Sequence, residues 1–405
     1  MDHAAGVGSE KGASQAVQKP PPPPRRDAPG VHGTSPQKTS AAVRGENGSA
    51  SADRPAVGEE PPEVGVVRDL HGFRIKGDEY IAKYREWIPL HQKKTAERKQ
   101  KWMEMFRKSP GTSYLEHKDL KKLVRKGIPD SSRGEVWMDV SGAKKLKLAN
   151  PGYYAKLLAE SKRDVNQEAA NQIELDLPRT FPDHISFRGS EETAMTIKLR
   201  HVLMAYANRN KVVGYCQGMN FIAGIMLLFL DEESAFWLLC ALLELILPVD
   251  YYAQDLSGCN VDLRVFKFML NKRYPKLMKS CEDAGLGVEF FGLEWFIALF
   301  GKTLPIETTL RVWDCVFNEG DKILFRIGLG LIDEGEKQLL SIKEPHELFA
   351  SVQSLGRDSL EADGLLKVGF KLQMKRSQVE DLRRQYRAEV RVERQQRQAN
   401  KAKAG

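Results

Sequence analysis

The amino-acid sequence predicts an all-α fold, and three features of the chain support this. Apolar residues of the segment 120–340 recur with helical spacing, as in residues 193–207, where Met195 and Leu199 fall on one helical face. Residues 235–247 are apolar on nearly every side, as in a helix at the centre of a large helical domain. No sustained two-residue alternation lies between turn signals, which argues against strands.

The composition indicates a globular protein of the cytoplasm. Hydrophobic residues make up 41% and charged residues 29% of the 405 positions, and this length allows a large core that needs no disulfides. The five cysteines are widely spaced and form no C-x-x-C pair, so we expect reduced thiols. The histidines form no H-E-x-x-H motif, and the sequence predicts no metal site.

Residues 1–66 form the first predicted segment, and we expect them to be disordered. They contain no Phe, Trp or Tyr and are rich in Pro, Gly, Ser and Ala, so they cannot bury enough apolar surface to offset the entropy of ordering. The first twenty residues lack the apolar stretch of a secretory signal. An unbroken proline run, Pro20–Pro24, is most simply a stiff solvated stretch; alternatively, it is a ligand for an SH3-type or WW-type domain.

The next segment is predicted to be a helical arm that leads into the main domain. Aromatic residues, absent before this point, appear at Phe73, Tyr80 and Trp87, and residues 93–108 are basic and helix-forming. The predicted order is therefore an arm at 67–119, a main domain at 120–340, its helical end at 341–374 and a tail at 375–405.

Apolar runs in the main domain predict buried helices. The two most apolar runs, 221–230 and 235–249, are separated by three acidic residues, and each is shorter than the roughly 18–20 residues of a membrane span. We therefore expect membrane contact to be peripheral at most. For the helix over 193–207, we expect Ser190 to be the N-cap and the two glutamates that follow it to favour the first turn.

The tail carries most of the positive charge. Residues 375–405 hold ten Lys and Arg against four Asp and Glu, a net charge of +6, which leaves +2 of the chain's +8 for the rest. The body therefore lacks the bias expected of a nucleic-acid-binding protein. Apolar residues from Leu372 to Val390 form only a partial helical stripe, so the simplest hypothesis is a solvated basic helix. Contact with a partner or with an anionic membrane is the alternative.

Two short stretches combine reactive polar residues with loop signals. In the first, Pro178 and Pro182 bracket Arg179, which disfavours a regular helix and predicts an arginine on a braced loop. A guanidinium held in this way suits the stabilisation of phosphate charge. From these residues alone, the favoured interpretation is the simpler one, in which Arg179 pairs with Asp176 to hold the loop.

The second stretch precedes the apolar run that starts at Phe221. Glycines at 214 and 218 allow close backbone approach and place Gln217 at the entrance of a helix. Alone, this stretch is as easily a helix cap with a hydrogen-bonding glutamine. Another segment, Gly301-Lys302-Thr303, ends like a phosphate-binding loop, but Phe296 stands where that motif needs a glycine, so we expect no nucleotide site there.

Taken together, the two stretches resemble the TBC family of Rab GTPase-activating proteins. Ile173, Asp176 and Arg179 match the I-x-x-D-x-x-R motif of that family, and Tyr215 and Gln217 match its Y-x-Q motif. The resemblance implies that Arg179 is an arginine finger and Gln217 a glutamine finger. It also implies that Asp176 orients Arg179 and that Tyr215 positions Gln217.

Further blocks of the same family follow in the expected order, over about residues 120–340. Arg133 and Trp137 resemble its R-x-x-x-W block, and Trp313 and Asp314 resemble part of a later block. The resemblance implies that these four residues form packing and buried-polar framework. With the preceding aromatic arm included, the chain most resembles the subgroup of growth-hormone-regulated TBC proteins.

The resemblance implies a GTPase activator that supplies catalytic residues in trans, rather than an enzyme with its own substrate. The expected partner is a Rab-family GTPase in its GTP-bound state, and the GTP and Mg²⁺ belong to that partner, so no cofactor of its own is expected. A TBC-like scaffold that binds a Rab without accelerating hydrolysis is the main alternative. An adaptor that works through the basic tail is the other.

Overall fold

The structure, a computed structural model of the chain, describes residues 65–161, 163, 166–188, 193–372 and 374–404. The chain divides into two units, residues 1–56 and 57–405, and every described residue lies in the second unit. The described residues form helices and no strand, which confirms the predicted all-α fold. The hypotheses of disorder before residue 65 and of a ligand at Pro20–Pro24 concern residues outside the described ones.

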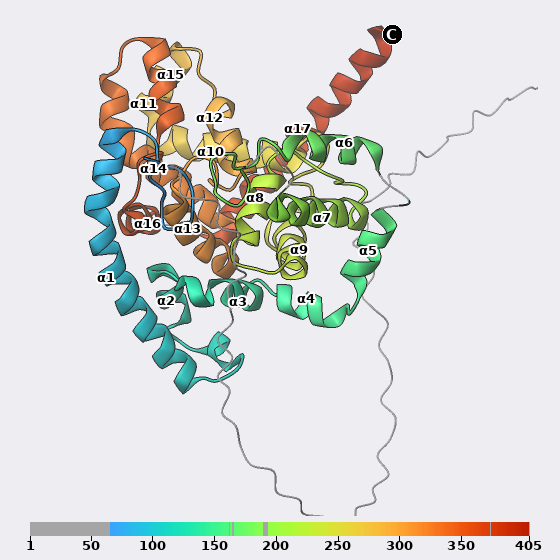
Figure 1. Cartoon of the computed structure of the whole chain (residues 1–405). Coiled ribbons are helices and arrows are strands. Elements are labelled where there is room, and N and C mark those ends of the chain that lie inside the picture. Colours follow the sequence, from blue (N-terminus) through green and yellow to red (C-terminus); the bar gives the residue numbers. More distant parts are fainter. Residues whose placement is uncertain (1–64, 162, 164–165, 189–192, 373, 405) are drawn as a thin grey trace, which may run out of the picture. The chain divides into compact units, whose positions relative to one another are not determined.

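Seventeen α-helices follow one another along the described part of the chain (Figure 1). The first nine are α1 (Asp78–Lys108), α2 (Leu120–Lys126), α3 (Asp130–Val140), α4 (Ala143–Ala149), α5 (Tyr153–Ser161), α6 (Gln167–Asp176), α7 (Ala194–Arg209), α8 (Met219–Leu227) and α9 (Glu232–Ala241). The others are α10 (Ser257–Arg273), α11 (Pro275–Asp283), α12 (Glu289–Ile297), α13 (Ile306–Glu319), α14 (Lys322–Ser341), α15 (Pro345–Ser354), α16 (Ala362–Lys371) and α17 (Arg376–Ala404). Two shorter turns are η1 (Ser113–Glu116), a 3₁₀ turn, and η2 (Leu242–Ile246), a π-helical turn.

Helix α9 lies at the centre of the core, as its apolar sequence predicts. Every residue from Ala235 to Ala241 is fully buried. The regular helix ends there, six residues before the end of the apolar segment, and continues as η2, in which the Leu247 N–H donates to the Leu242 carbonyl. The wider turn lets Glu244 form two 2.8 Å hydrogen bonds with the Arg209 guanidinium, so the carboxylate leaves the apolar core.

Helix α7 begins later than its sequence suggests. Thr193 is the N-cap, and its hydroxyl oxygen accepts from the Thr196 N–H at 3.1 Å. The expected cap Ser190 lies outside the described residues, three positions before this cap. The predicted apolar face is confirmed, because Leu199 and Val202 are both completely buried.

The predicted arm, residues 67–119, is not helical throughout, because the segment before α1 forms a hairpin. Residues Val67–Ile75, which we call the arm hairpin, fold back on themselves, with a bridge between Arg68 and Arg74 and a 2.8 Å bond from the Ile75 N–H to the Val67 carbonyl. Helix α1 follows, and its Tyr84 and Trp87 pack with Ile75 and Leu360 in a second apolar cluster. Two glycines, at 72 and 77, take positive φ angles and allow these turns, which helical periodicity does not reveal.

The first part of α17 is built into the domain, which differs from the solvated helix that the tail sequence favours. The helix packs along α10. Arg383 is buried and donates two 2.6 Å hydrogen bonds to Asp262, and a third carboxylate contact reaches Asp321 at 2.5 Å. Val379, one turn earlier, is also buried. Figure 1 shows the later turns of α17 extending beyond the other helices.

We expect Arg383→Ala to lower the free energy of unfolding by about 3–5 kcal/mol, because Asp262 and Asp321 would stay buried without their cation. Chemical denaturation of the full chain measures this. The matched control is Arg384→Ala, which removes an exposed arginine from the next position of the same helix and should change stability by less than about 0.5 kcal/mol. Equal effects of the two variants would contradict the buried role of Arg383.

No helix among the described residues combines the length and the apolar character needed to cross a lipid bilayer. All five cysteines are free thiols, as expected: Cys216, Cys240, Cys259, Cys281 and Cys315.

Candidate functional site

Arg179 lies in the loop that follows α6. The helix ends at Asp176, and the Thr180 hydroxyl donates to the Asp176 carbonyl at 2.7 Å, which closes the last turn. Pro178 cannot donate a backbone hydrogen bond and so favours the exit of the chain from the helix. The Arg179 side chain is 51% exposed, so its guanidinium can reach a partner.

The Arg179 side chain is held at its base by a buried carboxylate. Its Nε donates to Asp176 Oδ1 at 2.6 Å, and one terminal amino group also contacts that oxygen. Asp176 itself is completely buried. The Arg179–Asp176 pair expected of a purely structural arginine is therefore present, and it leaves the outer part of the guanidinium in solvent.

The same carboxylate binds the second motif. The Tyr215 hydroxyl donates to Asp176 Oδ2 at 2.5 Å. Burial, together with this carboxylate, raises the pKa of Tyr215 far above its usual range, so the phenol stays protonated and remains a donor. Asp176 thus links Arg179 to the stretch that carries Gln217.

Gln217 is exposed and lies one residue before the N-cap of α8. That cap is Gly218, which has a φ of 112°. A Cβ atom at this glycine would lie 2.3 Å from Cγ2 of Ile297, so only glycine fits this sharp turn. The turn leaves the Gln217 side chain at the surface, beside the helix entrance rather than within it.

A second polar bridge joins the two stretches through Thr180 and Asn220, two residues for which no role was predicted. The Asn220 side chain is completely buried; its Nδ2 donates to the Thr180 hydroxyl at 2.7 Å, and its Oδ1 accepts from the Gly218 N–H at 3.1 Å. Thr180 lies in the first motif stretch and Asn220 in the second. The available signal was Asn220 itself, a polar residue in the first turn of the apolar helix α8. The loops of Arg179 and Gln217 are therefore fastened to each other at two points.

The four framework residues lie in the core. Asp314 accepts hydrogen bonds from the Ile128 N–H at 2.9 Å, from Arg133 Nε at 3.1 Å and from Trp137 Nε1 at 2.8 Å. The indole of Trp313 donates to the Leu299 carbonyl at 2.9 Å. All four side chains are buried, so a partner protein cannot touch them.

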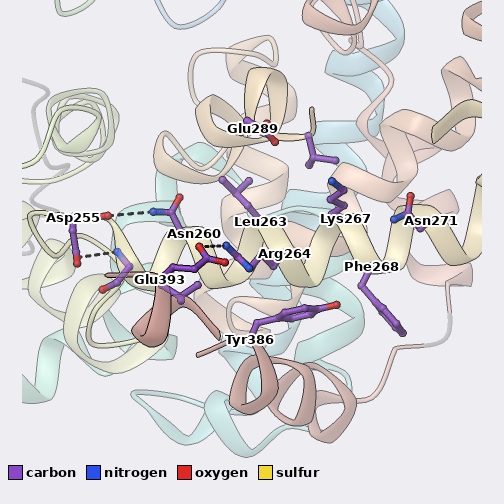
Figure 2. A pocket seen from close by; sticks show the side chains of 13 residues that line it. Asp255, Asn260, Leu263, Arg264, Lys267, Phe268, Asn271, Glu289, Tyr386 and Glu393 are labelled. Atoms are coloured by element: carbon purple, nitrogen blue, oxygen red, sulfur yellow. Dashed lines mark hydrogen bonds and ion pairs between the residues drawn. The ribbon is translucent and has the colours of Figure 1, made fainter. Parts of the chain in front are cut away.

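The most prominent groove among the described residues lies away from the exposed pair, Arg179 and Gln217. A groove of about 870 Å³ lies between α10 and α17, where Arg264 binds Glu393 at 2.6 Å and Tyr386 forms part of the wall (Figure 2). Neither Arg179 nor Gln217 lines this groove. Surface side chains fit a site that acts on another protein better than one that encloses a small substrate.

The remaining candidate sites give no support to other chemistry. The described residues contain no group of three His, Cys, Asp or Glu side chains arranged to hold a metal ion. The segment Gly301-Lys302-Thr303 lies in a turn after α12, where Leu299 and Phe300 are buried and Lys302 binds Glu294 at 2.7 Å. This turn is packed by side chains and offers no phosphate loop.

A family model described as the Rab-GTPase-TBC domain matches residues 130–340, more than half of the chain. The chain therefore belongs to the RabGAP-TBC family, as its motifs predict. Growth hormone-regulated TBC protein 1 of Xenopus tropicalis is 37% identical over 276 residues, which cover 68% of this chain and 79% of that protein. The human protein of that name is 39% identical over 273 residues, with 67% and 79% covered. The predicted likeness to this subgroup is thus confirmed.

Solved structures agree with the fold. The Chlamydomonas flagellar RabGAP TBC domain is 30% identical and superposes with a TM-score of 0.64, covering 76% of this chain and 99% of that one. The Ypt/Rab-GAP domain of Gyp1p gives a TM-score of 0.58 at 19% identity, covers 68% and 98% of the two chains, and supports the fold alone.

Proposed function

We propose that this chain is a GTPase-activating protein for a Rab-family GTPase, and that it supplies Arg179 and Gln217 to the GTP site of that partner. Family membership supports the activator function. The observation that carries the two-residue mechanism is the buried Asp176 carboxylate, which binds the exposed Arg179 and the Tyr215 of the Gln217 stretch. Two exposed polar side chains are thereby presented on one braced surface.

The role of Arg179 follows from the charge that develops during phosphoryl transfer. Hydrolysis of GTP places negative charge on the transferred group and on the β–γ bridging oxygen. Asp176 occupies the inner edge of the guanidinium, which leaves its outer donors for these oxygens. An arginine supplied in this way accelerates hydrolysis by about 10³–10⁵.

The role of Gln217 is to orient the attacking water. A side-chain amide carries both a donor and an acceptor, so it can bind the water and direct its lone pair at the γ-phosphorus. Small GTPases normally use a glutamine of their own for this step. Gln217 would take its place, and the GTP and Mg²⁺ would come entirely from the partner.

The partner is expected to dock around the two loops. Leu175, within the first motif stretch, and Val212, two positions before the second, are each 67% exposed. Exposed apolar side chains of this size are common at contact surfaces with other proteins. We infer that a Rab in its GTP-bound state covers them when it reaches Arg179.

The test is a hydrolysis screen of the full chain against a panel of purified, GTP-loaded Rab proteins. At least one Rab should show a stimulated rate, about 10³-fold or more above its intrinsic rate. Tight binding of a GTP-loaded Rab with no stimulation would favour the alternative of a non-catalytic scaffold.

A membrane role for the tail is a separate and smaller proposal. Residues 394–404 carry four basic and no acidic side chains, and they follow the part of α17 that is docked on α10. We infer peripheral contact with anionic membranes of the cytoplasm through this end. Co-sedimentation with anionic vesicles should be lost in a variant whose four basic residues are changed to Gln, and unchanged binding would refute it.

A further inference from the structure

The arm hairpin lies directly against the chain that follows Arg179. The Arg74 N–H donates to the Asp183 carbonyl at 3.1 Å, and the Ile185 N–H donates to the Gly72 carbonyl at 3.1 Å. A β-bridge pairs Phe73 with His184 between these two bonds. The arm hairpin is therefore joined through its backbone to a loop more than a hundred positions later in the sequence. We call this set of contacts the junction.

Side chains strengthen this junction. The Arg68 guanidinium donates to the Asp183 carbonyl at 3.0 Å. His184 Nδ1 accepts from the Ser186 N–H at 3.0 Å, so its Nε2 carries the proton and donates to the His71 carbonyl at 2.8 Å. Burial lowers the pKa of His184 to about 4, so the imidazole stays neutral and keeps this bonding pattern at physiological pH.

The junction reaches Arg179 through Phe181. This residue has a φ of 50°, a left-handed conformation that is strained for a residue with a side chain. Its ring is held between Phe73, with centroids 5.1 Å apart at 86°, and Phe221, with centroids 5.3 Å apart at 74°. Phe73 is thus one wall of the aromatic contact that keeps Phe181 in a strained backbone, two residues after Arg179.

We propose that the arm hairpin is a positioning element of the site, which fixes the chain at Phe181–Ile185 and thereby sets the direction of Arg179. This inference rests on the proposed function. The hairpin lies well before residues 130–340, the segment that the family model matches. Asp176 holds the near end of the Arg179 loop, and the hairpin holds its far end.

The hairpin offers two variants that act on the junction in different ways. Phe73→Ala removes one wall of the Phe181 contact. Gly72→Ala places a Cβ 2.9 Å from Cγ2 of Ile185 at a residue with a φ of 99°, so it pushes the loop away without deleting a side chain. A matched control is Phe106→Ala, which removes an aromatic ring near the other end of α1, where it contacts Trp102 and Tyr114 and not the hairpin.

The experiment measures GTP hydrolysis by a responsive Rab under the full-length variants, together with their melting temperatures. Phe73→Ala and Gly72→Ala should each lower the stimulated kcat by about tenfold or more and change KM less than about threefold. Phe106→Ala should keep kcat within about twofold. In an Arg179→Ala background, Phe73→Ala should lower the residual rate no further, because the hairpin acts through Arg179.

The proposal is wrong if both hairpin variants keep a normal kcat, if only KM rises, or if Phe73→Ala multiplies the loss caused by Arg179→Ala. If one of the two hairpin variants does not fold, the kcat of the other tests the proposal. Unfolding of both would show a structural role and overturn the proposal. A normal rate for Arg179→Ala alone is a different result, since it refutes the proposed function and not only the hairpin.

Discussion

Arg179→Ala is expected to lower the stimulated rate of GTP hydrolysis by at least about a hundredfold, because the variant lacks the exposed guanidinium that we propose binds the transferred phosphate. The side chain is half exposed and Asp176 keeps its hydrogen bond from the Tyr215 hydroxyl, so the fold should remain intact. Single-turnover release of γ-phosphate from a responsive Rab measures the loss, and the melting temperature verifies folding.

Arg179→Lys should recover little of this rate. An ammonium group is a point charge and cannot bind Asp176 through its inner edge while it presents further donors outward. Arg384→Ala, which removes an exposed arginine of α17, is the control for charge alone and should leave the rate unchanged. Normal stimulation by both Arg179 variants would eliminate the arginine from the mechanism.

Gln217→Ala is expected to abolish stimulation, both of a wild-type Rab and of a Rab whose own switch glutamine is changed to alanine. If Gln217 supplies the water-orienting amide, the glutamine of the partner becomes partly redundant. The Rab variant should therefore keep much of its stimulation by the wild-type chain. Single-turnover hydrolysis for the four combinations measures this.

The competing hypothesis for Gln217, a helix cap, makes the opposite prediction. A cap residue would lower the melting temperature when replaced, by the equivalent of about 1 kcal/mol, and would scarcely change the rate. The N-cap position of α8 is Gly218, which gives Gln217 no capping contact of its own to lose. Strong dependence on the Rab glutamine with none on Gln217 would leave Arg179 as a lone catalytic residue.

The helical fold could be predicted because its signal is local. Apolar spacing within 10 to 20 residues identified α7 and α9, and proline and glycine identified the two loops. Two helix ends were predicted wrongly. Helix α7 begins at a later N-cap, Thr193, and the regular part of α9 ends early because a π-helical turn follows it.

What could not be predicted depends on partners that are distant in the sequence. Arg383 looks like one more charge of a basic tail, and only its contact with Asp262, 121 positions away, shows that it belongs to the core. The arm hairpin looks like the start of a helical arm, because its partners lie near Asp183. Thr180 and Asn220 are small polar residues with no motif, and their bond spans 40 positions.

The buried Asp176 has a consequence for the kinetics of association. A free arginine side chain loses about 2 kcal/mol of rotamer entropy when it is immobilised. Asp176 restrains Arg179 in the isolated protein, so much of that loss accompanies the folding of this chain and not the encounter with a Rab. We therefore expect association without a slow rearrangement of the Arg179 side chain, so that differences in affinity between Rab partners arise chiefly from their rates of dissociation.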